Sequence, residues 1–120
     1  GNVANGNGVS AVGSYGFFVR LVNMRNVEVS QNAVKNYGRF AFIDSTPKTT
    51  AKGKGCMDVI IKDNFIIDSV DRFKASSVWV DGTVDNRAYN ISVIDNISDK
   101  KNSTSYRYVT NFKESGTKII

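Results

Sequence analysis

A short motif that returns three times at a fixed interval constrains the fold of this chain more than any other feature. The segments RNVEVSQN, MDVIIKDN and YNISVIDN end at Asn32, Asn64 and Asn96, so their last residues are 32 positions apart. Each copy reads Asn or Asp, Val or Ile, any residue, Val or Ile, two further residues and Asn. A constant period of this length predicts a repeat architecture in which each copy forms one structural unit.

A second element recurs between these motifs as a short run of aromatic and β-branched residues with period-two character, which is typical of a strand. Its copies are GFFVRLV (16–22), RFAFIDS (39–45), SSVWVDG (76–82) and SYRYVTN (105–111). Each repeat is therefore expected to carry a strand, an asparagine corner, a short second strand or bend, and a third strand.

This layout predicts an all-β chain that coils, with successive copies stacked about 4.8 Å apart as parallel strands. One coil cannot bury its inner face alone, so its neighbours supply the core. The three asparagines would then lie in one file as a ladder, and asparagine also tolerates the left-handed backbone that such a corner can need. The alternating apolar residues of the motif would point inward: Val27, Val29, Val59, Ile61, Ile91 and Val93. The alternative is an antiparallel sandwich or barrel, which requires no common register of the asparagines.

The repeated pattern Asn/Asp-Val-x-Val-x-x-Asn with its asparagine corner resembles the right-handed parallel β-helices of the pectate-lyase type, and among them phage tailspike and appendage proteins. The resemblance covers roughly residues 16–111. It implies a short single-stranded solenoid of three to four coils, with loops at 45–56 and 82–89, on a virion surface or in an extracellular setting. No catalytic motif matches residue by residue, so only the fold and the ladder of Asn32, Asn64 and Asn96 are carried over.

The 120 residues are expected to form a single β-helical domain. Within it, residues 1–15 would form a partial first coil or cap, 16–111 the coils and 112–120 a terminal cap. Ile60 and Ile94 would point away from the core, and exposed apolar patches often mark interfaces. A homo-oligomer is therefore expected, and the resemblance to tailspikes suggests a trimer.

The amino-acid composition limits the kinds of catalytic and metal-binding site that the chain can form. The chain contains no histidine, which excludes Ser-His-Asp triads, histidine-ligated zinc and imidazole acid–base catalysis within it. Its only cysteine, Cys56, cannot form an internal disulfide and is expected to be structural or incidental. No metal site or cofactor is expected, because no Asp-rich loop offers the six to eight oxygens that calcium takes. No stretch is apolar for the length of a membrane span.

Four aspartates are the candidates for catalysis. Asp63 and Asp95 occupy the same position one coil apart, so their backbones would lie about 5 Å from each other, near the carboxyl separation of retaining glycosidases. An Asp beside a corner Asn also commonly accepts local backbone hydrogen bonds, which is the structural alternative. Asp44 and Asp81 close the strands FAFID and VWVD beside aromatic residues. They suit a sugar site, or simply begin a turn.

Four further residues are the candidates for ligand binding: Trp79, Tyr106, Arg107 and Tyr108. Strand alternation would place Tyr106 and Tyr108 on one face, where aromatic rings can stack on sugars or on bases. Aromatic residues of the last coil's core would look the same in sequence. The loop TPKTTAKGKG (46–55) is the most basic segment and is a second place for an anion to bind.

The net charge of +5 favours an anionic partner. The first functional hypothesis is a module that binds a glycan or surface polymer, for attachment or adhesion. The second is a polysaccharide hydrolase or lyase that uses Asp63, Asp81 or Asp95. The third is a nucleic-acid-binding module, which ranks last because the positive charges are scattered and no nucleic-acid motif is present.

Overall fold

The computed structural model describes residues 1–6, 16–47, 55–70, 76–99 and 104–120. Their regular secondary structure consists of strands, with no helix among the described residues. Consequently the described part contains no helix that could cross a membrane. The strands are β1 (Val3–Asn5), β2 (Phe17–Val22), β3 (Arg25–Ser30), β4 (Ala33–Lys35), β5 (Arg39–Asp44), β6 (Met57–Lys62), β7 (Phe65–Ile67), β8 (Val78–Asp81), β9 (Ala88–Ile94), β10 (Ile97–Ser98), β11 (Thr104–Tyr106), β12 (Val109–Ser115) and β13 (Lys118–Ile119).

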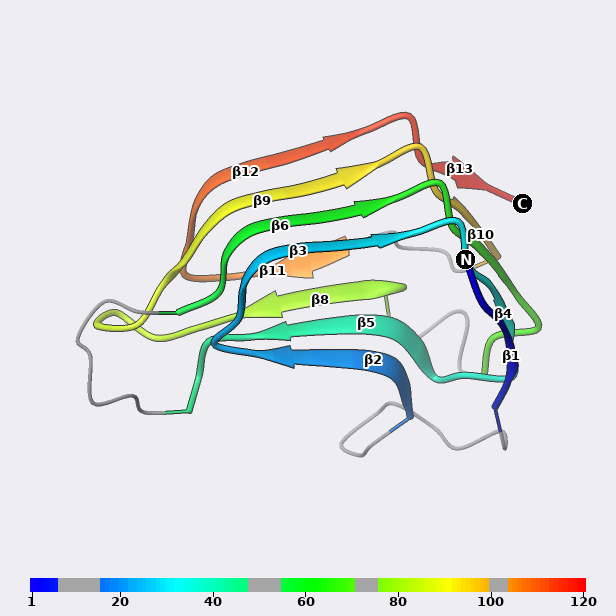
Figure 1. The fold of residues 1–120 in the computed structure, drawn as a ribbon, viewed down its shortest axis with the longest axis horizontal. Helices are drawn as coiled ribbons and strands as arrows, with labels where there is room; N and C mark the ends of the chain where they lie inside the picture. Colours follow the sequence, from blue (N-terminus) through cyan, green and yellow to red (C-terminus); the bar gives the residue numbers. More distant parts are fainter. Residues whose placement is uncertain (7–15, 48–54, 71–75, 100–103) are drawn as a thin grey trace.

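Every third strand belongs to the same sheet. Sheet A has the order β1-β4-β7-β10-β13, sheet B has β2-β5-β8-β11, and sheet C has β3-β6-β9-β12. Figure 1 shows sheets B and C as two sets of side-by-side arrows. All strand pairs in the described residues are parallel, which excludes the antiparallel sandwich or barrel. The fold is therefore all-β, with parallel strands in three sheets.

The repeated motif forms sheet C and the corner that follows it. Val27 pairs with Val59, and Val59 pairs with Ile91, so equivalent positions of the three copies lie in one column. In the two inner copies, the alternating apolar side chains are fully buried at Val59 and Ile61 and again at Ile91. This burial explains the β-branched content, because parallel strands covered on their inner face favour Val and Ile. Across the sheet, Ile60 lies on the outer face and is 38% exposed.

Among the described residues with a left-handed backbone, two sets belong to sheet C. One set lies at the corner after each sheet C strand, where Gln31, Asp63 and Asp95 have φ between 54° and 55°. Gly116 holds the fourth such corner at φ 67°, where a Cβ would overlap Asp95 Oδ1. The other set lies near the start of these strands, at Asn26, Asp58, Asn90 and Asn111. Asn and Asp tolerate this conformation better than other residues with a Cβ, which explains their recurrence.

The last copies differ from the expected boundaries. Residues 105–111 do not form one strand: β11 ends at Tyr106, β12 begins at Val109, and Tyr108 between them is left-handed with φ 53°. In the segment expected as a terminal cap, residues 112–115 continue β12, and Lys118–Ile119 form β13; these strands pair with β9 and β10. At the other end, β1 pairs with β4. Residues 7–15, and residues 48–54 of the basic loop, lie outside the described residues.

Candidate functional site

The corner asparagines form a continuous chain of hydrogen bonds. Asn32 Oδ1 accepts from the backbone N–H and Nδ2 of Asn2, at 2.9 and 3.1 Å. Asn64 Oδ1 accepts from the same two groups of Asn32, and Asn96 Oδ1 from those of Asn64, at 2.9 to 3.1 Å. The amides of Asn64 and Asn96 also donate to the carbonyls of Val29 and Ile61, both at 3.0 Å. This buried file satisfies backbone groups that would otherwise lack partners, so its role is structural.

The candidate carboxylates Asp63 and Asp95 lie at exposed corners directly before this file. Their backbone N–H groups donate to Ile94 O at 3.2 Å and Ser115 O at 2.9 Å. Both aspartates adopt the left-handed backbone, which agrees with the structural alternative for these positions.

The other two candidates, Asp44 and Asp81, are buried and lie opposite each other on neighbouring strands β5 and β8. Arg20 Nε donates to Asp44 Oδ2 at 3.1 Å, and Asp44 Oδ1 accepts from the N–H of Thr46 at 2.9 Å. Arg107 donates to both oxygens of Asp81, from Nε and from Nη2. These bonds raise the pKa of Arg107. Both carboxylates are thus held in ion pairs with an arginine.

Trp79 lies on the outer face of sheet B in a column with Arg20 and Phe42. The rings of Phe42 and Trp79 are stacked, with centroids 4.1 Å apart and planes at 7°. The Arg39 guanidinium lies 4.7 Å from the centre of the Trp79 ring, and that of Arg20 lies 5.5 Å from the centre of Phe42. Phe17 stacks next to Phe42, with centroids 5.3 Å apart. We call Phe17, Arg20, Arg39, Phe42 and Trp79 the arginine–aromatic strip.

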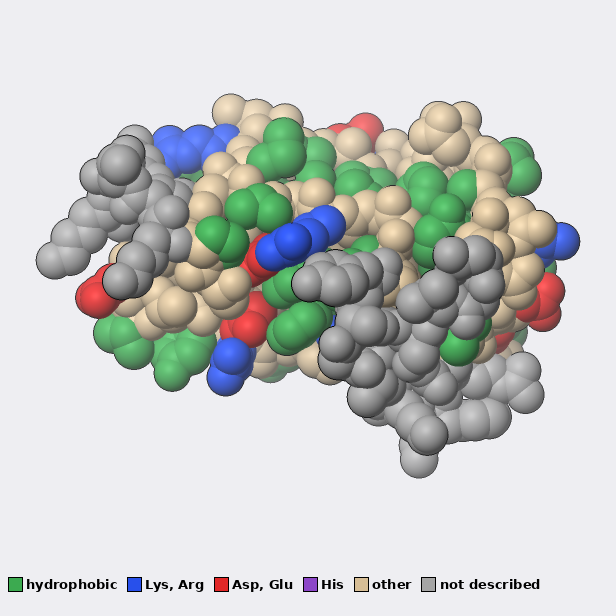
Figure 2. All heavy atoms as spheres, turned by 90° about the horizontal axis from the view of Figure 1, so that it is seen from below, with side chains coloured by type: hydrophobic (Ala, Val, Ile, Leu, Met, Phe, Trp, Pro, Cys, Tyr) green, Lys and Arg blue, Asp and Glu red, His purple; other side chains and the backbone are tan. Residues whose placement is uncertain are grey.

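Arg39 is the distinctive member of the strip. Its side chain is half-buried, and burial lowers its pKa. Its Nε is buried and has no hydrogen-bond partner within the described residues. Figure 2 looks onto the lower side of the molecule in Figure 1, where basic, acidic and hydrophobic side chains lie next to one another. The strip therefore places two arginine guanidinium groups against aromatic rings.

Tyr106, another predicted ligand-binding residue, does not lie on the same face of sheet B as Trp79. Tyr106 pairs with the buried Val80 and not with Trp79, so its ring lies toward the core side of sheet B. There it stacks on Phe112, with centroids 4.5 Å apart, beside the last layer of the core. Tyr106 and Trp79 therefore lie on opposite sides of sheet B, and Tyr106 and Tyr108 do not share one strand face as expected.

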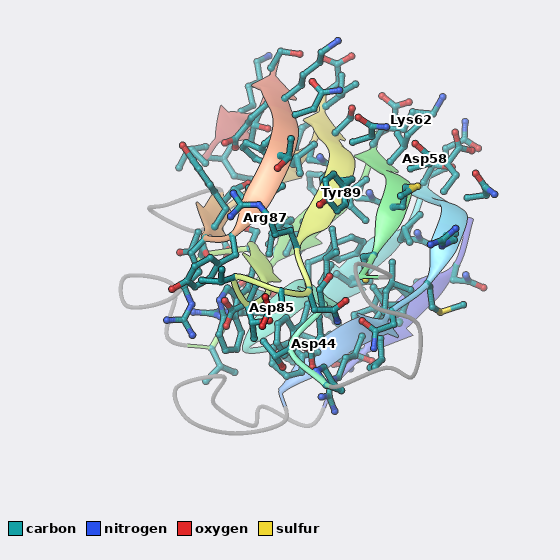
Figure 3. All side chains as sticks on the ribbon, turned by 90° about the vertical axis from the view of Figure 1, so that its left-hand side faces the viewer. Asp44, Asp58, Lys62, Asp85, Arg87 and Tyr89 are labelled. Atoms are coloured by element: carbon teal, nitrogen blue, oxygen red, sulfur yellow. The ribbon has the colours of Figure 1, made fainter. Side chains whose placement is uncertain are left out.

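Tyr108 instead forms a second basic cluster. The guanidinium groups of Arg87 and Arg107 lie 6.0 and 5.8 Å from the centre of its ring. Arg87 Nε donates to Thr110 Oγ1 at 3.1 Å. Figure 3 shows Arg87 just before β9 and Tyr89 on that strand. We call Arg87, Arg107 and Tyr108 the Arg87 corner.

Arg20, Arg39 and Arg87 were visible in the sequence but belonged to no recognisable constellation. Arg20 and Arg39 lie within the aromatic runs 16–22 and 39–45. If these runs form neighbouring parallel strands, an arginine on one strand can approach an aromatic ring on the next. The residues that pair across these runs are Arg20 with Phe42 and Phe42 with Trp79. These pairs are separated by unequal distances in the sequence, so the column could not be read from a fixed period.

Cys56 is buried, and its Sγ lies 3.3 Å from Leu21 O, which fits the structural role expected of it. Within the described ranges, no group of three or more His, Cys, Asp or Glu side chains could hold a metal ion. No protein-family model, curated protein or solved structure matches this chain, so the inferences below rest on its own residues.

Proposed function

We propose that this chain is a right-handed parallel β-helical module, extracellular or on a virion surface, that binds an anionic glycan or surface polymer along the outer face of sheet B. The recurrence of every third strand in the same sheet, at constant register in sheet C, supports the solenoid. Such a solenoid presents long, flat faces, which suit an extended polymer better than a compact ligand.

The observation that carries the binding proposal is the unpaired positive charge beside aromatic rings. Asp44 neutralises Arg20, and Asp81 neutralises Arg107. Arg39 and Arg87 form no ion pair within the described residues, yet each lies over an aromatic ring. A carboxylate or sulfate of a glycan would accept hydrogen bonds from these guanidinium groups. The apolar face of a sugar ring would pack against the exposed edges of the strip.

The test is binding of the native protein to an array of uronic-acid and sulfated glycans, followed by titration of the best ligand. Replacing Arg39 or Arg87 by Ala is expected to weaken binding at least tenfold, because each removes a charge-assisted hydrogen bond worth about 1.5–3 kcal/mol. Arg25→Ala is the matched control, since Arg25 is an exposed arginine on β3 of sheet C. Circular dichroism of each variant checks that it is folded.

Equal loss of binding in all three variants would show that only net charge matters and would reject the proposed site. Single-stranded DNA is tested beside the glycans. Equally tight and strongly salt-dependent binding to DNA would favour the nucleic-acid hypothesis over the glycan. Cleavage of any glycan that is abolished by Asp63→Asn or Asp95→Asn would instead favour a hydrolase or lyase.

Association of several copies is a separate part of the proposal. The exposed Ile60 and half-buried Ile94 on the outer face of sheet C support it. A homo-oligomer, with a trimer as the arrangement that the tailspike resemblance suggests, would bury this surface. Sedimentation of the native chain at micromolar concentration tests it, and a monomer would remove this part without affecting the glycan proposal.

A further inference from the structure

The outer face of sheet A is apolar, whereas the outer face of sheet C is mixed. One outward column of sheet A consists of apolar residues that pair in register across four strands: Val3, Ala33, Phe65 and Ile97. An outward column of sheet C varies in character: Glu28, Ile60, Ser92 and Lys113. A sheet face that contacts water usually carries polar side chains. The apolar column therefore indicates that the outer face of sheet A contacts an apolar partner.

This face is hollowed over β4. A hollow of about 280 Å³ lies across β1, β4 and β7, and its lining includes Val3, Ala33, Phe65, Ile67 and Lys35. Ala33 has the smallest side chain of its column and lies between Val3 and Phe65, which explains the depression at this point. Because β4 is paired on both sides, the floor of the hollow is continuous sheet. The hollow contains no residue of the arginine–aromatic strip or of the Arg87 corner, so it is a separate site.

Lys35 is the only charged residue among the described residues that line the hollow. It is exposed and lies on the outer face of β4, where it pairs with Ile67 of the next strand. Its ammonium group forms no ion pair within the described part of the chain. An apolar hollow with one unpaired cation at its side complements a ligand that is apolar along its length and negatively charged at one end.

We propose that this hollow binds an unbranched acyl chain that ends in a carboxylate. The chain lies across β4 between Val3 and Phe65, and the carboxylate accepts a hydrogen bond from the Lys35 ammonium group. Three neighbouring strands span about 10 Å from the first to the last, which suits a saturated chain of medium length.

A peptide fits this hollow less well than an acyl chain does. The apolar side chains of the face offer few partners to a peptide backbone, whose N–H and C=O groups would lose hydrogen bonds to water without replacement. An acyl chain has no such groups along its length. The volume of about 280 Å³ also lies near the lower end of the range for small-molecule pockets, which favours a small ligand over a protein segment.

The experiment uses the whole chain and decanoate as the probe, below the concentration at which decanoate forms micelles. Titration calorimetry measures binding, and changes in amide chemical shifts locate it. Decanoate is expected to bind and to shift the amide signals of β4 and β7. Decanol has the same chain without the charge and should bind at least tenfold more weakly, since it loses a charge-assisted hydrogen bond. Butyrate keeps the charge and should bind at least a hundredfold more weakly, since most of the apolar contact is lost.

Two chain variants test the hollow and the charge separately. Ala33→Phe fills the hollow and is expected to weaken binding of decanoate at least tenfold. Its matched control is Ser92→Phe, which adds the same side chain on the outer face of sheet C and should leave binding unchanged. Circular dichroism shows whether Ala33→Phe folds, and Ala33→Leu replaces it if it does not.

Lys35→Gln removes the charge and is expected to weaken binding of decanoate at least tenfold while leaving that of decanol unchanged. Its matched control is Lys118→Gln, because Lys118 is an exposed lysine on the outer face of the same sheet but outside the hollow. This control lowers the net charge equally and should leave binding unchanged.

Four results would overturn the proposal: absence of decanoate binding, equal affinity for decanoate and decanol, unchanged binding in Ala33→Phe, or equal weakening by Lys35→Gln and Lys118→Gln. Sedimentation of the native chain with and without decanoate provides a further test. Association that Ala33→Phe abolishes and decanoate does not reverse would also overturn the proposal, because the hollow would then receive a second copy of the chain.

Discussion

Two files of polar side chains cross the layers of this molecule, and they use asparagine for different reasons. In the buried file, Asn32, Asn64 and Asn96 are at most 5% exposed and pass hydrogen bonds from one layer to the next. In the exposed file, made by Asn26, Asp58, Asn90 and Asn111, the residues themselves adopt the left-handed backbone within or beside a strand. The first file needs the amide group, and the second mainly needs tolerance of positive φ.

The exposed file also contains hydrogen bonds between its side chains. Asn90 Nδ2 donates to Asp58 Oδ1 at 3.0 Å, and Asn111 Nδ2 donates to Asn90 Oδ1 at 2.6 Å. Water competes for these groups, so their loss costs little, whereas a buried amide leaves groups without any partner when it is removed. Similar contacts in the two files should therefore have different energetic consequences.

The largest effect is expected from Asn64→Ala in the buried file. It removes the acceptor of two Asn32 groups and the donor to Asn96 and Val29. The free energy of unfolding should fall by about 3 kcal/mol, since several buried polar groups lose their partners. Urea denaturation monitored by circular dichroism measures the change. A decrease in the free energy of unfolding no larger than that of Asn90→Ala would show that the buried and exposed files do not differ in their contribution to stability.

A smaller effect is expected from Asn90→Ala in the exposed file. Alanine at φ 53° is strained, which costs about 1 kcal/mol. Asn90→Gly has no Cβ and should stay within about 0.5 kcal/mol of the native chain in the same denaturation experiment. If Asn90→Gly lowered the free energy of unfolding as much as Asn90→Ala, the side-chain hydrogen bonds, and not the left-handed backbone, would explain the asparagines of the exposed file.

Thr117→Asn tests whether the buried file can be extended. Thr117 follows the left-handed Gly116 just as Asn96 follows Asp95, and its Oγ1 is buried without a hydrogen-bond partner within the described residues. An asparagine there would supply an Oδ1 to Asn96, with an expected gain of about 1 kcal/mol. The melting temperature should rise. A fall would show that the last layer is not equivalent to the others.

The smallest effect is expected from Asp58→Asn. Asparagine keeps the acceptor for Asn90 and tolerates φ 56°, so stability should change by no more than about 0.5 kcal/mol, as at other surface sites. The reverse exchange in the buried file, Asn64→Asp, puts a carboxylate at a buried site and removes a donor, so it should be clearly destabilising. Thermal denaturation of both variants compares the files directly.

Much of the fold could be predicted because its information is periodic. A motif that returns every 32 residues places equivalent residues in equivalent surroundings, so Val59 and Ile91 share a column and the asparagines share a corner. Alternation of apolar residues indicated which face of sheet C is buried, and the left-handed corners follow from the Asn and Asp at those positions.

The candidate sites were less predictable because they depend on non-periodic pairs. Arg20 reaches Asp44 across 24 residues, and Arg107 reaches Asp81 across 26. Neither separation is the period of the repeat. The connections between layers differ in length, so the register of sheet B had to be seen in three dimensions. For this reason the sequence did not show that both aspartates are held in ion pairs.

The run SYRYVTN illustrates the same limit. Its alternation predicts a strand with Tyr106 and Tyr108 on one face, yet the chain turns at Arg107 and Tyr108 and separates β11 from β12. The bidentate bond from Arg107 to Asp81 lies at this corner. A contact from an earlier layer thus accompanies a backbone change that local propensity does not indicate.

By itself, the sequence determined that strands recur in a common register with asparagines at one corner, because a repeated pattern imposes the same local preferences on every copy. Only the tertiary structure decided which charges are neutralised and which aromatic rings face outward. Those outcomes depend on contacts between residues whose separation along the chain varies from layer to layer. Because these separations do not follow the period of the repeat, the contacts could not be predicted from the repeated pattern.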